Sequence, residues 1–261
     1  MLETIEVTAG LVPAFVALVL VMGGAVVAAA HRAARVAGGG GAGARRAALV
    51  CALALAAWLA ATFGLASRGV LRFDTMPPTM IVLLVVVLAG SLTIGLSRVG
   101  ARLALGIPLG LLVVAQGFRL PLELIMHQLY LDGLMPEQMS YSGLNYDVLT
   151  GLLAIPVGVL YAMGRLPLSV VRAWNVMGLL LLVNVLTIAV LSAPTPLRVF
   201  TNEPVNVWVT MVPWVWLPAL LVPLALIGHV LVFRRLRFEE RAGDARFEGQ
   251  PAAVPAAAPR G

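Results

Sequence analysis

One polar stretch, residues 116–147, holds most of the side chains in this sequence that could carry out chemistry. If its first part is helical, a turn of about 100° per residue places five polar side chains on one stripe about 80° wide. The stripe is formed by Gln116, Arg119, Glu123, His127 and Tyr130. Asn145 follows in the next segment and is predicted to reach the same region.

Arg119 and Glu123 are four residues apart, a spacing at which opposite charges can form an ion pair on a helix. His127 follows Glu123 at the same spacing. A guanidinium can clamp an anionic group, and a carboxyl or an imidazole can act as a general acid or base. The stripe is therefore a candidate site for a small solute, an ion or a proton.

The composition indicates which kind of protein must position this stripe. The chain has 261 residues, of which 61% are hydrophobic and 11% are charged. Its mean hydropathy is +0.98. Soluble domains carry about 45–50% apolar and about 25% charged residues. The sequence therefore predicts an all-α integral membrane protein.

A membrane-spanning helix needs about 20 apolar residues to cross a hydrocarbon core about 30 Å thick. Seven runs approach this length, and the seventh contains three prolines that should kink it. The predicted spans are 11–30, 47–66, 78–97, 103–122, 148–164, 174–193 and 207–233. We expect a bundle of seven transmembrane helices within residues 1–238. The remaining residues, 239–261, are rich in Ala, Pro, Gly and Arg and are predicted to form a disordered tail.

Arginine supplies every basic residue of the chain, and its distribution predicts the orientation. Fourteen of the 18 arginines fall in segments 31–46, 98–102 and 165–172 and in the tail from residue 234. By the positive-inside rule these segments are cytoplasmic, which places the N-terminus outside and the C-terminus inside. We expect a multi-pass protein of the cell membrane. Its basic excess would face the anionic inner leaflet of the lipid bilayer rather than nucleic acid.

The predicted depth of the stripe allows three interpretations. With a fourth span over 103–122, Arg119 and Glu123 lie near the outer edge of the membrane and face the bundle or a cavity, because ionisable groups that face lipid are costly. In a second interpretation the helix ends near Pro121, and residues 122–131 form a separate helix on the membrane surface. In a third, an Arg–Glu–His network only fixes helix packing.

Polar and aromatic residues elsewhere have structural explanations. Asn145 is predicted to cap the fifth span, with Asp147 favourable to its helix dipole. Asn175 and Asn184 point to opposite faces of the sixth span, so each is predicted to bond a neighbouring helix. His229 is predicted to be a packing or interfacial residue near the cytoplasmic end of the seventh span. Three tryptophans cluster in the outer half of that span, the first of them at the expected interfacial belt: Trp208, Trp214 and Trp216.

The sequence also excludes several kinds of chemistry. Without lysine, no Schiff base can form with retinal or pyridoxal. The three histidines are predicted to lie on opposite sides of the membrane, and no two of them are four residues apart. Glu123 and His127 supply at most two of the three close ligands that a zinc hydrolase site needs. Cys51 is the single cysteine. We therefore expect no metal and no cofactor.

Three functional hypotheses remain. The first is a transporter or sensor that binds a small solute or ion in an outward-facing polar pocket lined by the stripe and Asn145. The second is a membrane-embedded enzyme with Glu123 or His127 as general acid or base, for which no nucleophile or metal set is evident. The third is an accessory subunit that acts through a membrane-protein partner or as a homo-oligomer.

Overall fold

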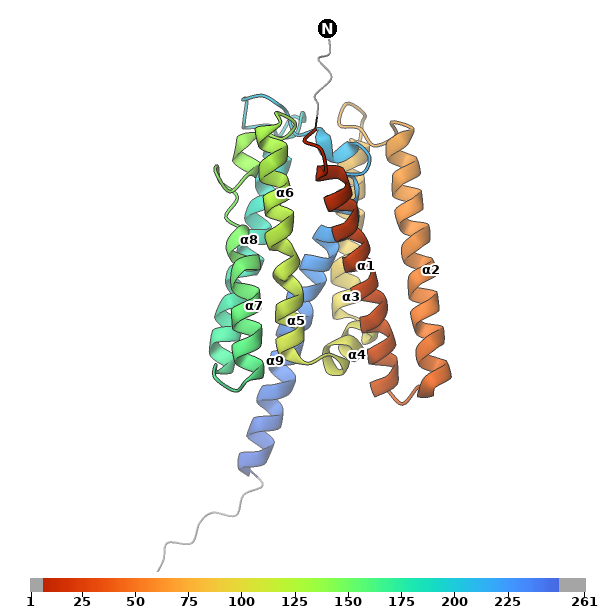
Figure 1. Ribbon diagram of the computed structural model, residues 1–261, viewed down its shortest axis with the longest axis vertical. Helices are drawn as coiled ribbons and strands as arrows, with labels where there is room; N and C mark the ends of the chain where they lie inside the picture. Colours follow the sequence, from red (N-terminus) through yellow and green to blue (C-terminus); the bar gives the residue numbers. More distant parts are fainter. Residues whose placement is uncertain (1–6, 249–261) are drawn as a thin grey trace, which may run out of the picture.

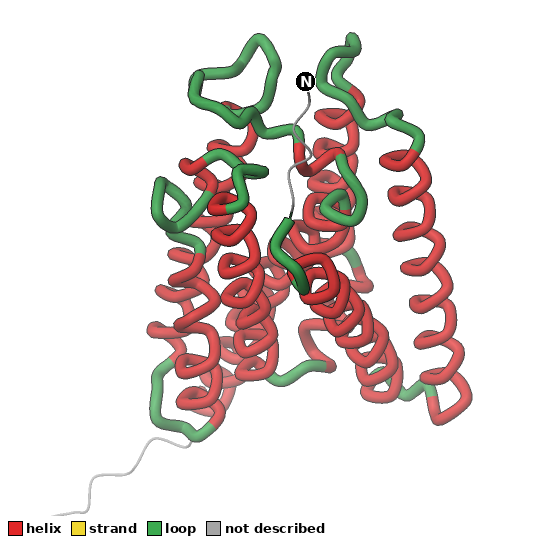
Figure 2. Tube along the Cα trace, turned by 45° about the horizontal axis from the view of Figure 1, so that its top comes forward, coloured by secondary structure: helices red, strands yellow, loops and turns green. Residues whose placement is uncertain are grey.

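The computed structural model describes residues 7–248, and these residues form helices and loops without a strand (Figures 1 and 2). The loops gather at the two ends of an elongated bundle. The all-helical fold class is therefore confirmed for the described residues. The α-helices are α1 (Leu11–Val36), α2 (Gly40–Ser67), α3 (Thr79–Leu96), α4 (Arg98–Gly106), α5 (Leu109–Ala115), α6 (Arg119–Leu131), α7 (Val148–Ala162), α8 (Leu168–Leu191) and α9 (Val222–Glu248).

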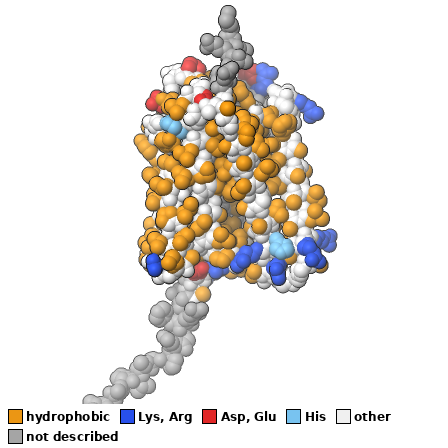
Figure 3. All heavy atoms as spheres, in the orientation of Figure 1, with side chains coloured by type: hydrophobic (Ala, Val, Ile, Leu, Met, Phe, Trp, Pro, Cys, Tyr) orange, Lys and Arg blue, Asp and Glu red, His pale blue; other side chains and the backbone are white. Residues whose placement is uncertain are grey.

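Six helical segments are long and apolar enough to cross a membrane by length and composition. They are α1, α2, α3, the joined segment Leu109–Leu131, α8 and Leu217–Ala242. The shorter α7 has 15 residues and is also apolar. Apolar side chains cover the middle of the face seen in Figure 3, and charged side chains lie toward its two ends. This arrangement is typical of a membrane protein.

The predicted fourth span begins in the wrong place. Residues 103–106 belong to the separate helix α4, and the span begins only at Leu109. Ile107 is extended, with φ −112° and ψ 130°, because the residue before a proline is disfavoured in the helical region. Pro108 then precedes the first residue of α5. The shift matters for the polar stripe, since Arg119 now lies midway along the 23-residue segment Leu109–Leu131 rather than near its outer edge.

Pro121 neither ends the helix nor starts a surface helix. A short 3₁₀ turn, Gln116–Phe118, joins α5 to α6, and both Phe118 and Arg119 keep helical backbone angles. Proline lacks the N–H that would bond the carbonyl of Gly117, and its ring crowds that carbonyl, so a local tightening here is expected. The second interpretation of the stripe, a separate helix over 122–131, is therefore wrong.

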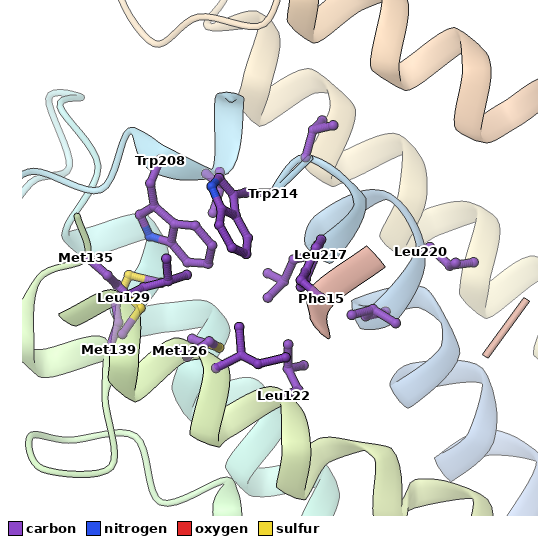
Figure 4. Packing of buried hydrophobic residues seen from close by; sticks show 14 of the residues in the cluster. Phe15, Leu122, Met126, Leu129, Met135, Met139, Trp208, Trp214, Leu217 and Leu220 are labelled. Carbon is purple, nitrogen blue, oxygen red and sulfur yellow. The ribbon is translucent and has the colours of Figure 1, made fainter. Parts of the chain in front are cut away.

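The predicted seventh span also begins later than expected. Residues 207–216 contain a 3₁₀ turn at Trp208–Thr210, and a π-helical turn at Leu217–Leu221 leads into α9. Trp208 and Trp214 are buried among other side chains of the protein. Their ring centroids lie 6.0 Å apart, and Trp214 also packs 4.9 Å from Phe15 of α1 (Figure 4).

The last helix runs further than the predicted domain boundary at residue 238. α9 continues to Glu248. The rest of the predicted tail, residues 249–261, lies outside the described residues.

Arginines at one end of the bundle bond the carbonyl groups that helix ends leave free. Arg234 Nη1 donates to the carbonyls of Gly95 and Ser97, at 2.7 and 2.8 Å. Arg32 Nε donates to the carbonyl of Gly106 at 2.9 Å, at the break between α4 and α5. The last carbonyls of a helix have no partner within it and carry partial negative charge, so these cations stabilise the helix ends. We call this end, where α1, α3 and α4 terminate, the basic end.

Candidate functional site

The centre of the bundle contains a fully buried arginine. Arg119, 1% exposed, donates from Nε to Asp147 Oδ2 at 2.6 Å. Its Nη2 also forms an ion pair with Asp147. The third guanidinium nitrogen, Nη1, reaches His229 Nε2 at 2.8 Å and the carbonyl of Gly178 at 3.4 Å. This single side chain of α6 therefore contacts the start of α7, the middle of α8 and the middle of α9.

The arginine determines the protonation of His229. A guanidinium has only donors, so His229 Nε2 must accept and the ring proton must lie on Nδ1. Nδ1 in turn lies 2.9 Å from Asn175 Oδ1, a suitable acceptor. Asn175 Nδ2 donates to the backbone carbonyl of His229 at 3.1 Å. His229 is therefore a neutral imidazole held between α6 and α8. We call Arg119, Asp147, His229 and Asn175 the central network.

A glycine on α8 makes room for this histidine. A Cβ at Gly178 would lie 2.6 Å from His229 Cε1 and 2.6 Å from Thr150 Cγ2. Real Cβ contacts are not this short, so a larger residue would push both side chains away. The close approach also brings the Gly178 carbonyl within reach of Arg119.

Asp147 balances the charge of Arg119 and extends the hydrogen bonding. Its Oδ1 accepts from Thr150 Oγ1 at 3.0 Å, and its backbone N–H donates to Asn145 Oδ1 at 3.1 Å. Asp147, not Asn145, is the N-cap residue of α7, and its side chain makes no capping bond to the helix backbone. The expectation that Asn145 caps this helix is therefore wrong.

Glu123 is buried one turn beyond Arg119 but has a different partner. Asn145 Nδ2 donates to Glu123 Oε2 at 2.7 Å and to the carbonyl of Met139 at 2.9 Å. The ion pair expected between Arg119 and Glu123 does not form, because Asp147 from the neighbouring helix occupies the guanidinium. Glu123 is 2% exposed and no cation among the described residues pairs with it.

A cavity of about 80 Å³ lies beside Glu123. Its wall is formed by α3, α6, α8, the π-helical turn and the start of α9, and nearly all of its residues are apolar. The polar residues among them are Arg119, Glu123, Asp147 and Asn206. Met126 and Met139 lie on the wall, and Figure 4 shows them among the buried residues that pack near Leu122. The volume exceeds that of a single water site.

The structure divides the predicted stripe into two parts. Gln116 is buried against Gly228 of α9, and its Oε1 has no hydrogen-bond partner among the described residues. His127 and Tyr130 lie farther along α6, both partly buried. His127 Nδ1 is 2.7 Å from Ser140 Oγ, and its ring stacks on Tyr141 at 4.2 Å. Gln116, Arg119, Glu123 and Asn145 are thus central, and the other two residues lie apart from the cavity.

Sequence reasoning missed two of the central residues. Asp147 and His229 were assigned structural roles at helix ends, and both belong to the central network. Buried polar residues in apolar segments are the signal that could have identified them. The interhelical role predicted for Asn175 is confirmed, since its Nδ2 donates to the carbonyl of His229 in α9. The same prediction for Asn184 is wrong, because its Nδ2 donates to the carbonyl of Leu144, in the loop before α7, at 2.9 Å.

Comparison with known proteins gives a family and no function. Residues 76–237, well over half of the chain, match a family model described as a domain of unknown function (DUF8737). This region contains the whole central network and all of the cavity wall except Phe73. No curated protein and no solved structure matches the chain.

The buried ion pair can be tested by single and paired substitutions. Arg119→Gln and Asp147→Asn each leave one buried charge without a partner, which costs about 3–5 kcal/mol. The double variant should lose less than the sum of the two. Melting curves of the purified protein in detergent measure the effect. Arg72→Gln, in an exposed pair with Asp74, is the matched control and should melt with wild type. Equal melting of all the variants would contradict a buried pair.

Proposed function

The chain belongs to the family described as domain of unknown function (DUF8737), and we propose that it is a multi-span membrane protein that binds a small solute in the cavity beside Glu123. A transporter or a sensor would use such a site. The observation that carries the proposal is a buried carboxyl without a cation partner, that of Glu123, on the wall of a largely apolar cavity. Ligand sites combine an apolar wall with a few placed polar groups.

The roles of the two charged residues on α6 differ in this proposal. Arg119 is occupied by Asp147, His229 and Gly178, so it is not free to clamp an anionic solute as the sequence suggested. It instead fixes the positions of α7, α8 and α9 around the cavity. Glu123, held from one side by Asn145, is the residue that would meet the solute.

A joint acid–base role for Glu123 and His127 finds no support in their contacts. Glu123 bonds Asn145, whereas His127 bonds Ser140 and stacks on Tyr141. A shared acid–base function requires both groups within reach of one reacting atom. Solute binding, by contrast, requires only that Glu123 lies on the wall of the cavity.

We further propose seven membrane crossings, with α7 as the shortest, in the cell membrane. Residues 132–147 continue the path of α7 toward the end of the bundle opposite the basic end, and several of them are buried. Non-helical backbone at membrane depth is tolerated where protein covers it. The arginine-rich segments, 14 of 18 arginines, favour a cytoplasmic basic end and an N-terminus outside.

The orientation can be tested by labelling single cysteines in intact cells. Cys51→Ser removes the native thiol, and Gly41→Cys or Ser142→Cys then supplies one new thiol. An impermeant maleimide should label position 142 and leave position 41 unlabelled until the cells are lysed. Labelling at position 41 but not at 142 in intact cells would reverse the proposed topology.

Solute binding can be tested by filling the cavity. A panel of small amines, carboxylates and alcohols is screened for a rise in the melting temperature, because a ligand that binds the folded state stabilises it by mass action. At least one member should raise the melting temperature of wild type, and Ala189→Leu, on the cavity wall, should abolish the rise.

The matched control for that experiment is Ala173→Leu, an exposed position on the same helix. This variant should keep the response of wild type. If no compound of any charge shifts the wild-type protein, or if Ala189→Leu responds like wild type, the cavity is not a solute site.

A further inference from the structure

We infer that the solute is a small monocation with N–H donors on an apolar body, a protonated alkylamine in its simplest form, bound between Glu123 and Asn206. This inference rests on the proposed function and names the class of solute. It follows from the charge balance of the buried centre, from an unused acceptor in the cavity wall and from the apolar character of the remaining wall.

The buried centre has one carboxyl more than it has cations. Arg119 and Asp147 neutralise each other, and His229 is neutral because its Nε2 accepts from Arg119. Glu123 remains, with an amide rather than a cation as its bonded neighbour. An ionised carboxyl in an apolar interior is costly unless a cation pairs with it. A bound monocation would make the centre electrically neutral.

Asn206 supplies a second acceptor to the same cavity. It is 2% exposed and lies on the cavity wall. Its Nδ2 donates to the carbonyl of Ala189 at 2.8 Å, which orients the amide. Its Oδ1 has no hydrogen-bond partner among the described residues. Buried acceptors are normally satisfied, so Asn206 Oδ1 and the carboxyl of Glu123 together call for a ligand that brings donors.

The rest of the wall favours an apolar body for the ligand. Leu122 and Met126 of α6 and Leu217 of the π-helical turn lie on the wall and are shown in Figure 4. Contact between these side chains and a hydrocarbon ligand is favourable, because both surfaces are removed from water. The same side chains offer no hydrogen bond to a polar ligand. A hydrated inorganic ion would make no apolar contact with these side chains.

Two further residues of the cavity wall, Leu84 of α3 and Leu186 of α8, are only partly buried. Both are apolar, so this part of the wall also suits the apolar body of the ligand.

An anionic solute fits this cavity poorly. The guanidinium of Arg119 is the single cation on the wall, and each of its three nitrogens contacts a protein acceptor. Arg119 Nη2 forms an ion pair with Asp147, although the geometry of this contact is not that of a hydrogen bond. An anion would have to displace Asp147 and would stand beside the carboxyl of Glu123.

Three probes of similar size and different charge distinguish the solute classes. Butylammonium, butyrate and butanol are titrated into the purified full-length protein in detergent, and the melting temperature gives an apparent Kd for each. Butylammonium should stabilise wild type, and butyrate and butanol should not. Glu123→Gln should weaken butylammonium binding about ten-fold or more, because a charge-assisted hydrogen bond is lost.

Two further variants complete the test. Glu137→Gln changes an exposed acidic residue and should bind butylammonium like wild type. Asn206→Leu removes the second acceptor and should weaken binding even if Glu123→Gln does not fold. Stabilisation by butyrate or butanol equal to that by butylammonium, or unchanged butylammonium binding in both cavity variants, would overturn the inference and leave solute binding intact. If none of the three probes and no compound of the solute panel raises the melting temperature of wild type, the proposed function itself is refuted.

Discussion

A guanidinium that cannot lose its proton lies in the centre of an apolar bundle, and the surrounding structure depends on its neutralisation. Asp147 supplies the opposite charge, His229 supplies a lone pair and Gly178 supplies a carbonyl. These three acceptors come from three different helical segments. Apolar side chains alone specify helix positions weakly in lipid, because lipid tails are as apolar as the side chains. The interactions of Arg119 therefore fix where α7, α8 and α9 must lie.

The same neutralisation determines what Glu123 can do. Because Asp147 occupies Arg119, the second carboxyl of the region has no cation of its own and lies on the wall of the cavity. A direct Arg119–Glu123 pair, as the spacing on one helix suggested, would have left Asp147 as the uncompensated group. The choice of partner thus separates a structural ion pair from a candidate binding group.

The helical class and four of the central residues, Gln116, Arg119, Glu123 and Asn145, could be predicted from the sequence, but their partners could not. Periodicity placed Gln116, Arg119 and Glu123 on one face correctly, because it depends only on the geometry of one helix. It could not show that Asp147 or His229 would approach that face, since such contacts are set by packing between segments distant in the chain. His229 lies 110 residues from Arg119 and reaches it only because Gly178 leaves room.

The predicted positions of Arg119 and Trp208 differ from the structure for local reasons. Pro108 separates α4 from α5 and moves Arg119 from the expected edge to the middle of its segment. Trp208 was expected at a membrane interface, and the structure packs it against Trp214 and buries it completely. Hydropathy measures whether a segment suits a membrane and carries no information on which neighbours cover a side chain.

The protonation state of His229 reports directly whether Arg119 donates a hydrogen bond to this ring. Nitrogen-15 NMR of histidine-labelled protein, with the resonance assigned by His229→Gln, distinguishes the two ring nitrogens. We expect a neutral ring with the proton on Nδ1 and an unprotonated Nε2 that accepts a hydrogen bond. A proton on Nε2, in either the other tautomer or the imidazolium, would show that Arg119 does not donate to His229 and would contradict the central network.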